Sequence, residues 1–191
     1  KINVLKYLDD VDENCKIIGA SNTVINEDGF LKGYNTDMDG FLEPIKNRNV
    51  IIKNSNILLL GAGGAARAII AGMSKEKAKH VTIVNRNNEN AIKLEKFSKS
   101  IGLEAEIKTI EEMSELHADY NFIINSSSLG LKNEANIIPT KIINDETVVY
   151  DIVYKPVNTE LIKESKKKNA VIIYGYEMLL GQAVRSFEIW L

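Results

Sequence analysis

The chain has 191 residues, and its 24 Lys and Arg against 26 Asp and Glu leave a formal charge of only −2, without the basic excess that nucleic-acid binding normally requires. Its one cysteine, Cys15, cannot form an intramolecular disulfide or a Cys-rich zinc site, so we expect a reducing, cytoplasmic compartment. The apolar runs fall far short of the ~20 residues that cross a bilayer, so we expect no membrane partner, and no signal peptide is expected at the start.

The first fifty residues differ in texture from the rest. Their predicted elements are helices over Ile2–Leu8 and Val11–Ile18, strands over Ser21–Ile25 and Phe30–Tyr34, and a helix from Asp37 to about Lys46. The pair Asp28-Gly29 stands between the two strands and is a strong signal for a tight β-hairpin. The polar segment from Asn47 to Ser55 then indicates a linker into a second domain.

The hairpin is expected to gather polar side chains at its open end. Counting outward from the turn places Asn22 opposite Asn35, and Asp37 follows two residues later at the start of the helix. Two amides and a carboxylate therefore converge, as a catalytic cluster requires. The alternative is that Asn35, Thr36 and Asp37 only cap the helix, since all three residue types are favoured near helix starts.

From residue 56 onward, short runs rich in β-branched residues alternate with segments of helical period, which is typical of βαβ units. The predicted strands are Asn56–Leu60, His80–Val84, Glu104–Lys108, Asn121–Asn125, Val148–Val153 and Ala170–Tyr174. The predicted helices are Ala65–Ser74, Glu89–Ile101, Ile110–Leu116 and Asn158–Lys167. The best architecture is α/β, a doubly wound parallel sheet of the Rossmann type.

A glycine-rich turn follows the first of these strands. The run Gly61-Ala62-Gly63-Gly64-Ala65-Ala66 fits the pattern G-x-G-x-x-A between a strand and a helix. Gly61 permits the tight turn, Gly63 lets the backbone approach a pyrophosphate, and Ala66 lets the helix pack closely on the sheet. The free amides and the positive end of the helix favour phosphate there, so a dinucleotide site is predicted.

The end of the second strand predicts which dinucleotide binds. An NAD site would place an acidic residue about 20 positions after the glycines, but this chain has Asn85-Arg86-Asn87 there. The planar fork of Arg86 suits a 2′-phosphate, so NADP is the predicted cofactor. The alternative is an exposed arginine without a role. The missing acidic residue also disfavours a methyltransferase, which shares a glycine-rich first loop.

Ligand contacts are also expected where the later strands end. Ser126 follows the fourth strand and can approach a ribose or a nicotinamide, while Ile152 and Gly175 lie at the ends of the fifth and sixth. In the last helix, Met178 and Gln182 are four residues apart and share one face. They offer an apolar surface and an amide. The alternative is that these residues serve packing alone.

Six motifs occur in a fixed order along the chain. They are GASNT from Gly19, GYNTD from Gly33, GAGGA from Gly61, the pair Asn85-Arg86, YDIVYKP from Tyr150 and MLLGQA from Met178. In order and spacing they resemble the shikimate dehydrogenase family over essentially the whole chain. The resemblance implies an oxidoreductase that reversibly reduces 3-dehydroshikimate to shikimate with NADPH, in chorismate and aromatic amino-acid biosynthesis.

The resemblance also implies roles for particular residues. Lys1 and Asp37 would be the catalytic pair, with Lys1 as the lysine that ends the family's N-V-T-x-P-x-K motif. The substrate would be bound by Asn22, Asp37, Tyr154 and Gln182. The cofactor would be bound by Gly61, Ala62, Gly63, Gly64, Ala65, Asn85, Arg86, Ser126, Ile152, Gly175 and Met178.

Some positions depart from the family pattern or carry no expected chemistry. Asn87 and Asn90 stand where the family often has a threonine and a second basic residue, which leaves Arg86 as the main donor to a 2′-phosphate. His80 and His117 are isolated in the sequence, so we expect no metal site.

Residues 1–48 are predicted to be the C-terminal part of a smaller α/β substrate domain. Residues 49–175 are predicted to form the NADP-binding domain, and residues 176–191 a helix that returns toward the substrate domain. The family's first strands and helices have no counterpart here, so the chain is expected to be part of a longer protein. Two alternatives stay open: a dinucleotide-binding fragment without activity, and a quinate/shikimate dehydrogenase that uses NAD. A monomer or homodimer with a small-molecule substrate is expected.

Overall fold

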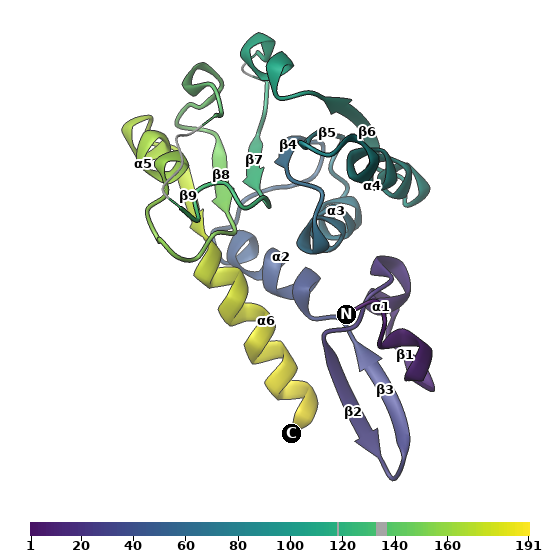
Figure 1. The fold of residues 1–191 in the computed structure, drawn as a ribbon. Helices are drawn as coiled ribbons and strands as arrows, with labels where there is room; N and C mark the ends of the chain where they lie inside the picture. Colours follow the sequence, from purple (N-terminus) through teal and green to yellow (C-terminus); the bar gives the residue numbers. More distant parts are fainter. Residues whose placement is uncertain (118, 133–136) are drawn as a thin grey trace.

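A six-stranded parallel sheet and the helices that cover it form the larger part of the computed structural model, which describes residues 1–117, 119–132 and 137–191 (Figure 1). Its strands are β4 (Asn56–Leu60), β5 (His80–Val84), β6 (Glu104–Lys108), β7 (Phe122–Asn125), β8 (Val148–Asp151) and β9 (Val171–Tyr174). They lie in the order β6-β5-β4-β7-β8-β9, and every neighbouring pair is parallel. From β4 the chain adds β5 and β6 on one side of the sheet and then β7, β8 and β9 on the other side. The predicted doubly wound Rossmann-type fold is therefore confirmed.

Helices and short turns cover both faces of this sheet because successive strand residues point to opposite sides. On one face, Ile57 and Leu59 pack under α3 (Gly64–Lys75), with α4 (Asn88–Ser100) beside it. On the other face, Leu58 and Leu60 pack with α5 (Glu160–Lys167) and the 3₁₀ helices η2 (Glu111–Glu115) and η3 (Thr140–Ile142). The strands are therefore buried on both sides.

A smaller, three-stranded sheet precedes the large one in the chain. It contains β1 (Asp10–Val11), β2 (Thr23–Glu27) and β3 (Phe30–Tyr34) in the order β1-β3-β2, with η1 (Leu5–Tyr7) and α1 (Glu13–Ile18) beside it. Antiparallel β2 and β3 pair Glu27 with Phe30 and Thr23 with Tyr34. The predicted hairpin and its register are confirmed.

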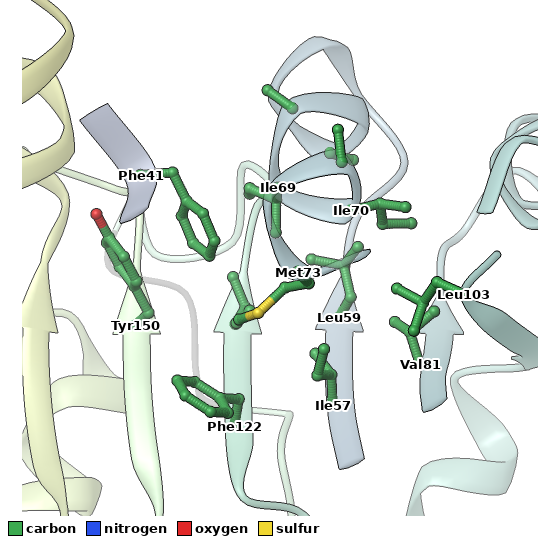
Figure 2. Packing of buried hydrophobic residues seen from close by; sticks show 14 of the residues in the cluster. Phe41, Ile57, Leu59, Ile69, Ile70, Met73, Val81, Leu103, Phe122 and Tyr150 are labelled. Carbon is green, nitrogen blue, oxygen red and sulfur yellow. The ribbon is translucent and has the colours of Figure 1, made fainter. Parts of the chain in front are cut away.

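Two helices connect the small sheet with the large one. Phe41 of α2 (Asp37–Asn47) stacks on Tyr150 of β8, with ring centroids 4.9 Å apart (Figure 2). α6 (Gly175–Trp190) crosses α2 so closely that a Cβ on Gly40 would lie 2.8 Å from the Cα of Gln182. From the end of β9, α6 runs toward the hairpin (Figure 1). It thus places Gln182 beside the start of α2.

Several predicted helices are shorter or of another type. The segment Ile2–Leu8 forms a 3₁₀ helix only over Leu5–Tyr7, and Ile110–Leu116 forms one over Glu111–Glu115, since such short segments offer few bonds to offset helix nucleation. Val11–Ile18 begins as a strand, because Asp12 caps α1 by accepting a hydrogen bond from the backbone N–H of Cys15. η3 was not predicted.

The strand predicted over Val148–Val153 ends at Asp151 instead. The Asp151 carboxylate accepts a hydrogen bond from the backbone N–H of Val153, and this local bond turns the chain out of the sheet. No helix among the described residues has the length and apolar character needed to span a bilayer.

Candidate active site

A lysine–carboxylate pair joins the beginning of the chain to the first residue of α2. Lys1 Nζ lies 2.5 Å from Asp37 Oδ2, and Asn22 Nδ2 donates to Asp37 Oδ1 at 2.9 Å. The Asp37 side chain is only 10% exposed, whereas half of the Lys1 side chain is accessible. Asp37 is therefore held from two sides, and the ammonium group beside it remains open to a ligand.

Of Asn35, Thr36 and Asp37, which precede or begin α2, only Asn35 caps the helix with its side chain. Asn35 Oδ1 accepts a hydrogen bond from the backbone N–H of Asp37 at 3.0 Å. Thr36, at the N-cap position, makes no side-chain capping bond. The Asp37 carboxylate faces Lys1 and Asn22, so capping does not explain its position.

The amide group of Asn22 has a defined orientation. Its Nδ2 donates to Thr36 Oγ1 and to Asp37 Oδ1, both at 2.9 Å. Its Oδ1 accepts from the backbone N–H of Thr36 at 3.0 Å and from Thr23 Oγ1 at 3.1 Å. Because both amide hydrogens and both oxygen lone pairs are engaged, the Nδ2 atom is directed toward Asp37.

The glycine-rich turn after β4 approaches the loop after β7 closely. Gly61 has φ +94°, and a Cβ there would lie 2.7 Å from the backbone nitrogen of Ser127. Ser126 Oγ donates to the carbonyl of Leu60 at 2.8 Å, and this hydrogen bond links the loop after β7 to the end of β4. Gly63, by contrast, has φ −87° and open space where its Cβ would be. α3 begins directly after Gly63, so its first N–H groups face this space.

A cavity of about 430 Å³ opens in front of this turn. Six of the predicted cofactor residues are in its described lining: Gly61, Ala62, Gly63, Asn85, Arg86 and Ser126. The lining also includes Asn87, Asn90, Ile110, Ser127, Ser128, Leu129 and Ile137. Arg86 is the charged group among these, and none of the described lining residues is a carboxylate. A dinucleotide phosphate fits this arrangement of free backbone amides and one cation.

Asn85 links the glycine-rich turn to the end of β5. Its Oδ1 accepts a hydrogen bond from the backbone N–H of Ala62 at 3.2 Å, and its Nδ2 donates to the carbonyl of Asn87 at 2.7 Å. The Asn87 side chain caps α4 by accepting from the backbone N–H of Asn90. Asn85 thus shapes the turn, while the exposed Arg86 extends from the cavity edge.

The remaining predicted residues lie outside the described lining of this cavity. Gly64 and Ala65 are the first residues of α3. Gly175 begins α6 in such close contact with Ile152 that a Cβ would overlap the Ile152 carbonyl. Met178 is buried in the core with Phe41.

The two predicted substrate residues farther along the chain are accessible. Tyr154 is 54% exposed on the turn after β8. Gln182 is half-buried on α6, and its Nε2 donates to the carbonyl of Leu179 in the preceding turn at 2.8 Å. A ligand can replace this local bond without leaving a buried group unpaired.

A buried carboxylate with no role predicted from the sequence connects two strand ends. Asp151 Oδ1 accepts from Asn125 Nδ2 at 2.9 Å, and Asp151 Oδ2 accepts from Thr159 Oγ1 at 2.6 Å. Asn125 Oδ1 in turn accepts from Ser127 Oγ at 2.6 Å. Burial raises the pKa of Asp151 above its usual value, against the lowering effect of these donors. Asp151 therefore braces the loop of serines that lines the cavity of about 430 Å³.

Asp151→Ala is expected to lower the free energy of unfolding by about 3 kcal/mol, since the buried Asn125 amide, the Thr159 hydroxyl and the Val153 N–H lose their acceptor. The raised folded-state pKa means that the folded state binds the proton more tightly than the unfolded chain. The difference in unfolding free energy between the wild type and the variant should therefore grow as the pH falls through the folded-state pKa toward the ordinary aspartate pKa of about 4. Urea unfolding followed by circular dichroism at several pH values measures both effects.

The control is Asp145→Ala, which removes an exposed carboxylate and should change the free energy of unfolding by less than about 0.5 kcal/mol. Equal stability of the two variants would show that the Asp151 network does not brace the strand ends.

His80 and His117 are closer in space than in sequence. Both line a shallow hollow of about 320 Å³ that also contains Thr82, Glu106 and Tyr120. Tyr120 donates to Thr82 Oγ1 at 3.2 Å, and Thr82 Oγ1 donates to Glu106 Oε1 at 3.0 Å. In the part of the chain that the structure describes, no three His, Cys, Asp or Glu residues are placed to hold a metal ion.

Known proteins match this chain over its whole length. A family profile described as shikimate / quinate 5-dehydrogenase matches residues 45–171. An NADP(+) shikimate dehydrogenase from Nitrosopumilus maritimus (strain SCM1) is 62% identical over 190 residues, which cover 100% of this chain and 70% of the relative.

Solved structures agree with these matches. Shikimate 5-dehydrogenase from Listeria monocytogenes, in complex with shikimate and NAD, has a TM-score of 0.92 at 32% identity over 100% of this chain and 69% of its own. Shikimate 5-dehydrogenase from Thermus thermophilus, in complex with NADP(H) and shikimate, has a TM-score of 0.84 at 32% identity, again over 100% and 69%. The chain thus spans about 70% of the length of these proteins.

Proposed function

This chain belongs to the shikimate / quinate 5-dehydrogenase family, and we infer that it is an NADP-dependent oxidoreductase that reversibly reduces 3-dehydroshikimate to shikimate. This reaction is a step of chorismate and aromatic amino-acid biosynthesis. The observation that carries the proposal is the Lys1–Asp37 pair, because oxidation of a secondary alcohol needs a group that takes the hydroxyl proton.

The pair suits proton transfer in both directions. Lys1 Nζ is accessible and gives a proton to the carbonyl oxygen of 3-dehydroshikimate as that carbon is reduced, or takes it from the hydroxyl of shikimate. Asp37 holds the ammonium group in place, and Asn22 in turn holds Asp37. Bound NADP supplies the hydride acceptor or donor. The protein's own part is thus to place one proton donor beside the reacting oxygen.

The substrate lies, in this proposal, between the small sheet and α6. Asn22 and Asp37 face the substrate hydroxyls from the hairpin and α2, while Gln182 reaches them from α6. Tyr154 contacts the substrate from the turn after β8. The cavity of about 430 Å³ would hold the phosphates and the adenosine end of NADP, and Ile152, Gly175 and Met178 would hold the cofactor's other end.

Arg86 is the proposed partner of the NADP 2′-phosphate. Arg86→Ala should lower the ratio of kcat/KM with NADP to kcat/KM with NAD about 10- to 100-fold, the loss expected for a charge-assisted hydrogen bond. Steady-state kinetics with both cofactors measures this ratio.

Arg185→Ala serves as the control, since Arg185 lies on α6 and pairs with Glu188 of the same helix. It should leave the cofactor ratio unchanged. A full preference for NADP in the Arg86→Ala protein would remove Arg86 from the cofactor site.

We propose that the two sheets belong to two domains. Residues 1–48 form part of the substrate-binding domain, residues 49–175 the NADP-binding domain, and residues 176–191 the helix that returns to the former. The packing of α6 on α2 at Gly40 and Gly181 supports this division. The protein is proposed to act in the cytoplasm as a monomer or homodimer on a small-molecule substrate, without nucleic acid or membrane as a partner.

Turnover tests the proposed function directly. The full-length protein, mixed with NADP⁺ and shikimate, should produce NADPH, and the rate should exceed that with quinate and NAD⁺. Faster turnover of quinate with NAD⁺ would favour a quinate dehydrogenase, and absence of turnover with every combination would reject the enzyme assignment.

A further inference from the structure

We propose that Ser186 is a positioning residue of the catalytic site, because its hydroxyl group joins the helix that carries Gln182 to the hydrogen-bond network that holds Asn22 and Asp37. This proposal rests on the function proposed above, which gives those three residues their roles.

The burial of Ser186 is unusual for the helix on which it lies. On α6, the apolar residues Leu180, Val184 and Phe187 are between 54% and 60% exposed, whereas Ser186 is only 7% exposed. A surface helix normally places its apolar side chains inward and its small polar side chains outward. The close packing of α6 on α2 accounts for a small residue at this inward position, but alanine would meet that requirement equally well. The hydrogen bonds of Ser186 explain why the residue carries a hydroxyl group.

The Ser186 hydroxyl group has hydrogen-bond partners on two other elements and on its own helix. Its Oγ lies 2.7 Å from Thr23 Oγ1 of the hairpin and 3.0 Å from Thr36 Oγ1 at the start of α2. It donates to the backbone carbonyl of Gln182, one turn earlier on α6, at 2.9 Å. A hydroxyl group has one donor and two acceptor positions. Because Thr23 Oγ1 gives its one proton to Asn22 Oδ1, Ser186 accepts from Thr36 and shares its own proton between Thr23 Oγ1 and the Gln182 carbonyl.

The connection continues from Thr36 to the proposed catalytic pair. Thr36 Oγ1 accepts a hydrogen bond from Asn22 Nδ2, so its own proton is available for Ser186. The second hydrogen of Asn22 Nδ2 goes to Asp37 Oδ1. A continuous path of hydrogen bonds therefore runs from the backbone of Gln182 through Ser186, Thr36 and Asn22 to Asp37. Removing the Ser186 hydroxyl leaves a buried threonine without its acceptor and loosens this path.

Ser186→Ala in the full-length protein should lower kcat/KM for shikimate about tenfold, the effect of one lost buried hydrogen bond. KM for NADP should stay unchanged, because none of these bonds touches the cofactor cavity. The matched control is Ser165→Ala on α5. Ser165 is fully buried and donates to the carbonyl of Leu161, also four residues earlier, at 2.7 Å, and its replacement should leave both kinetic constants unchanged.

A double-mutant cycle with Thr36→Val separates positioning from a general loss of structure. If both side chains act through one bond, the double variant should be about as slow as the slower single variant, whereas independent effects would multiply. The proposal would be overturned if the losses of kcat/KM in the two single variants multiplied in the double variant. It would also be overturned if Ser186→Ala were as active as Ser165→Ala.

If Ser186→Ala does not fold, Thr36→Val removes the same bond from the other side, together with the acceptor of Asn22 Nδ2, and unchanged kcat/KM for shikimate would then overturn the proposal. Failure of the wild-type protein to oxidise shikimate would instead reject the proposed function, and this proposal with it.

Discussion

Asp37→Asn is expected to lower kcat for shikimate oxidation about 100- to 10,000-fold, the range that positioned acid–base groups contribute. Asparagine keeps the shape of the side chain and can still bond to Asn22, but it lacks the charge that holds the Lys1 ammonium group. Lys1→Met should cause a loss of similar size, because it removes the proposed proton donor itself. Steady-state kinetics of both variants, with NADP affinity from titration calorimetry, measures the effect.

Asp39→Asn is the control for this pair. Asp39 lies on the same helix and accepts a hydrogen bond from Asn14 at 3.2 Å, but it has no contact with Lys1 among the bonds described. It should keep kcat within about twofold of wild type, as expected of a residue outside the reacting groups. Equal losses of kcat and of NADP affinity in Asp37→Asn would show that Asp37 only maintains the fold.

Gly61→Ala should both destabilise the protein and abolish tight NADP binding. The positive φ of +94° is strained for alanine, and its Cβ would lie 2.7 Å from Ser127 N and 2.8 Å from Ser126 C. We expect a loss of about 2–4 kcal/mol of unfolding free energy from these two causes together. The displaced serine loop should also weaken NADP binding by at least about tenfold, because a misplaced backbone donor loses its hydrogen bond.

Gly63→Ala separates cofactor contact from stability. Gly63 has an ordinary φ of −87° and no atom within 4 Å of an added Cβ, so the unfolding free energy should change by less than about 0.5 kcal/mol. NADP affinity should nevertheless fall, since the methyl group would occupy the space that the pyrophosphate approaches. Unchanged NADP affinity in both glycine variants would place the cofactor elsewhere.

The large sheet could be predicted from the sequence because its strands are buried on both faces. The predicted bounds of Asn56–Leu60, His80–Val84 and Glu104–Lys108 coincide with β4, β5 and β6, whose apolar and β-branched runs stand between clear turns. The short helices were predicted less well. In Val11–Ile18, one aspartate at the cap decided where α1 begins.

The site could be predicted only where local spacing determines it. Hairpin register placed Asn22 near Asp37, and the strand–turn–helix pattern placed Arg86 beside the glycine turn. Ser186 could not be found in this way, because its partners Thr23 and Thr36 lie at least 150 residues earlier in the chain. The Asp151 network likewise depends on the order of strands in the sheet, which brings β7 beside β8.

A crystal structure of the full-length protein with NADP⁺ and shikimate would test the proposed catalytic site by direct observation. We expect the hydroxyl group that is oxidised to lie within hydrogen-bond distance, about 3 Å, of Lys1 Nζ. Asp37 should still bond to Lys1, and Arg86 should bond to the 2′-phosphate of NADP⁺. Shikimate bound away from Lys1 and Asp37, with the cofactor outside the cavity at Gly61 and Gly63, would contradict the proposed site.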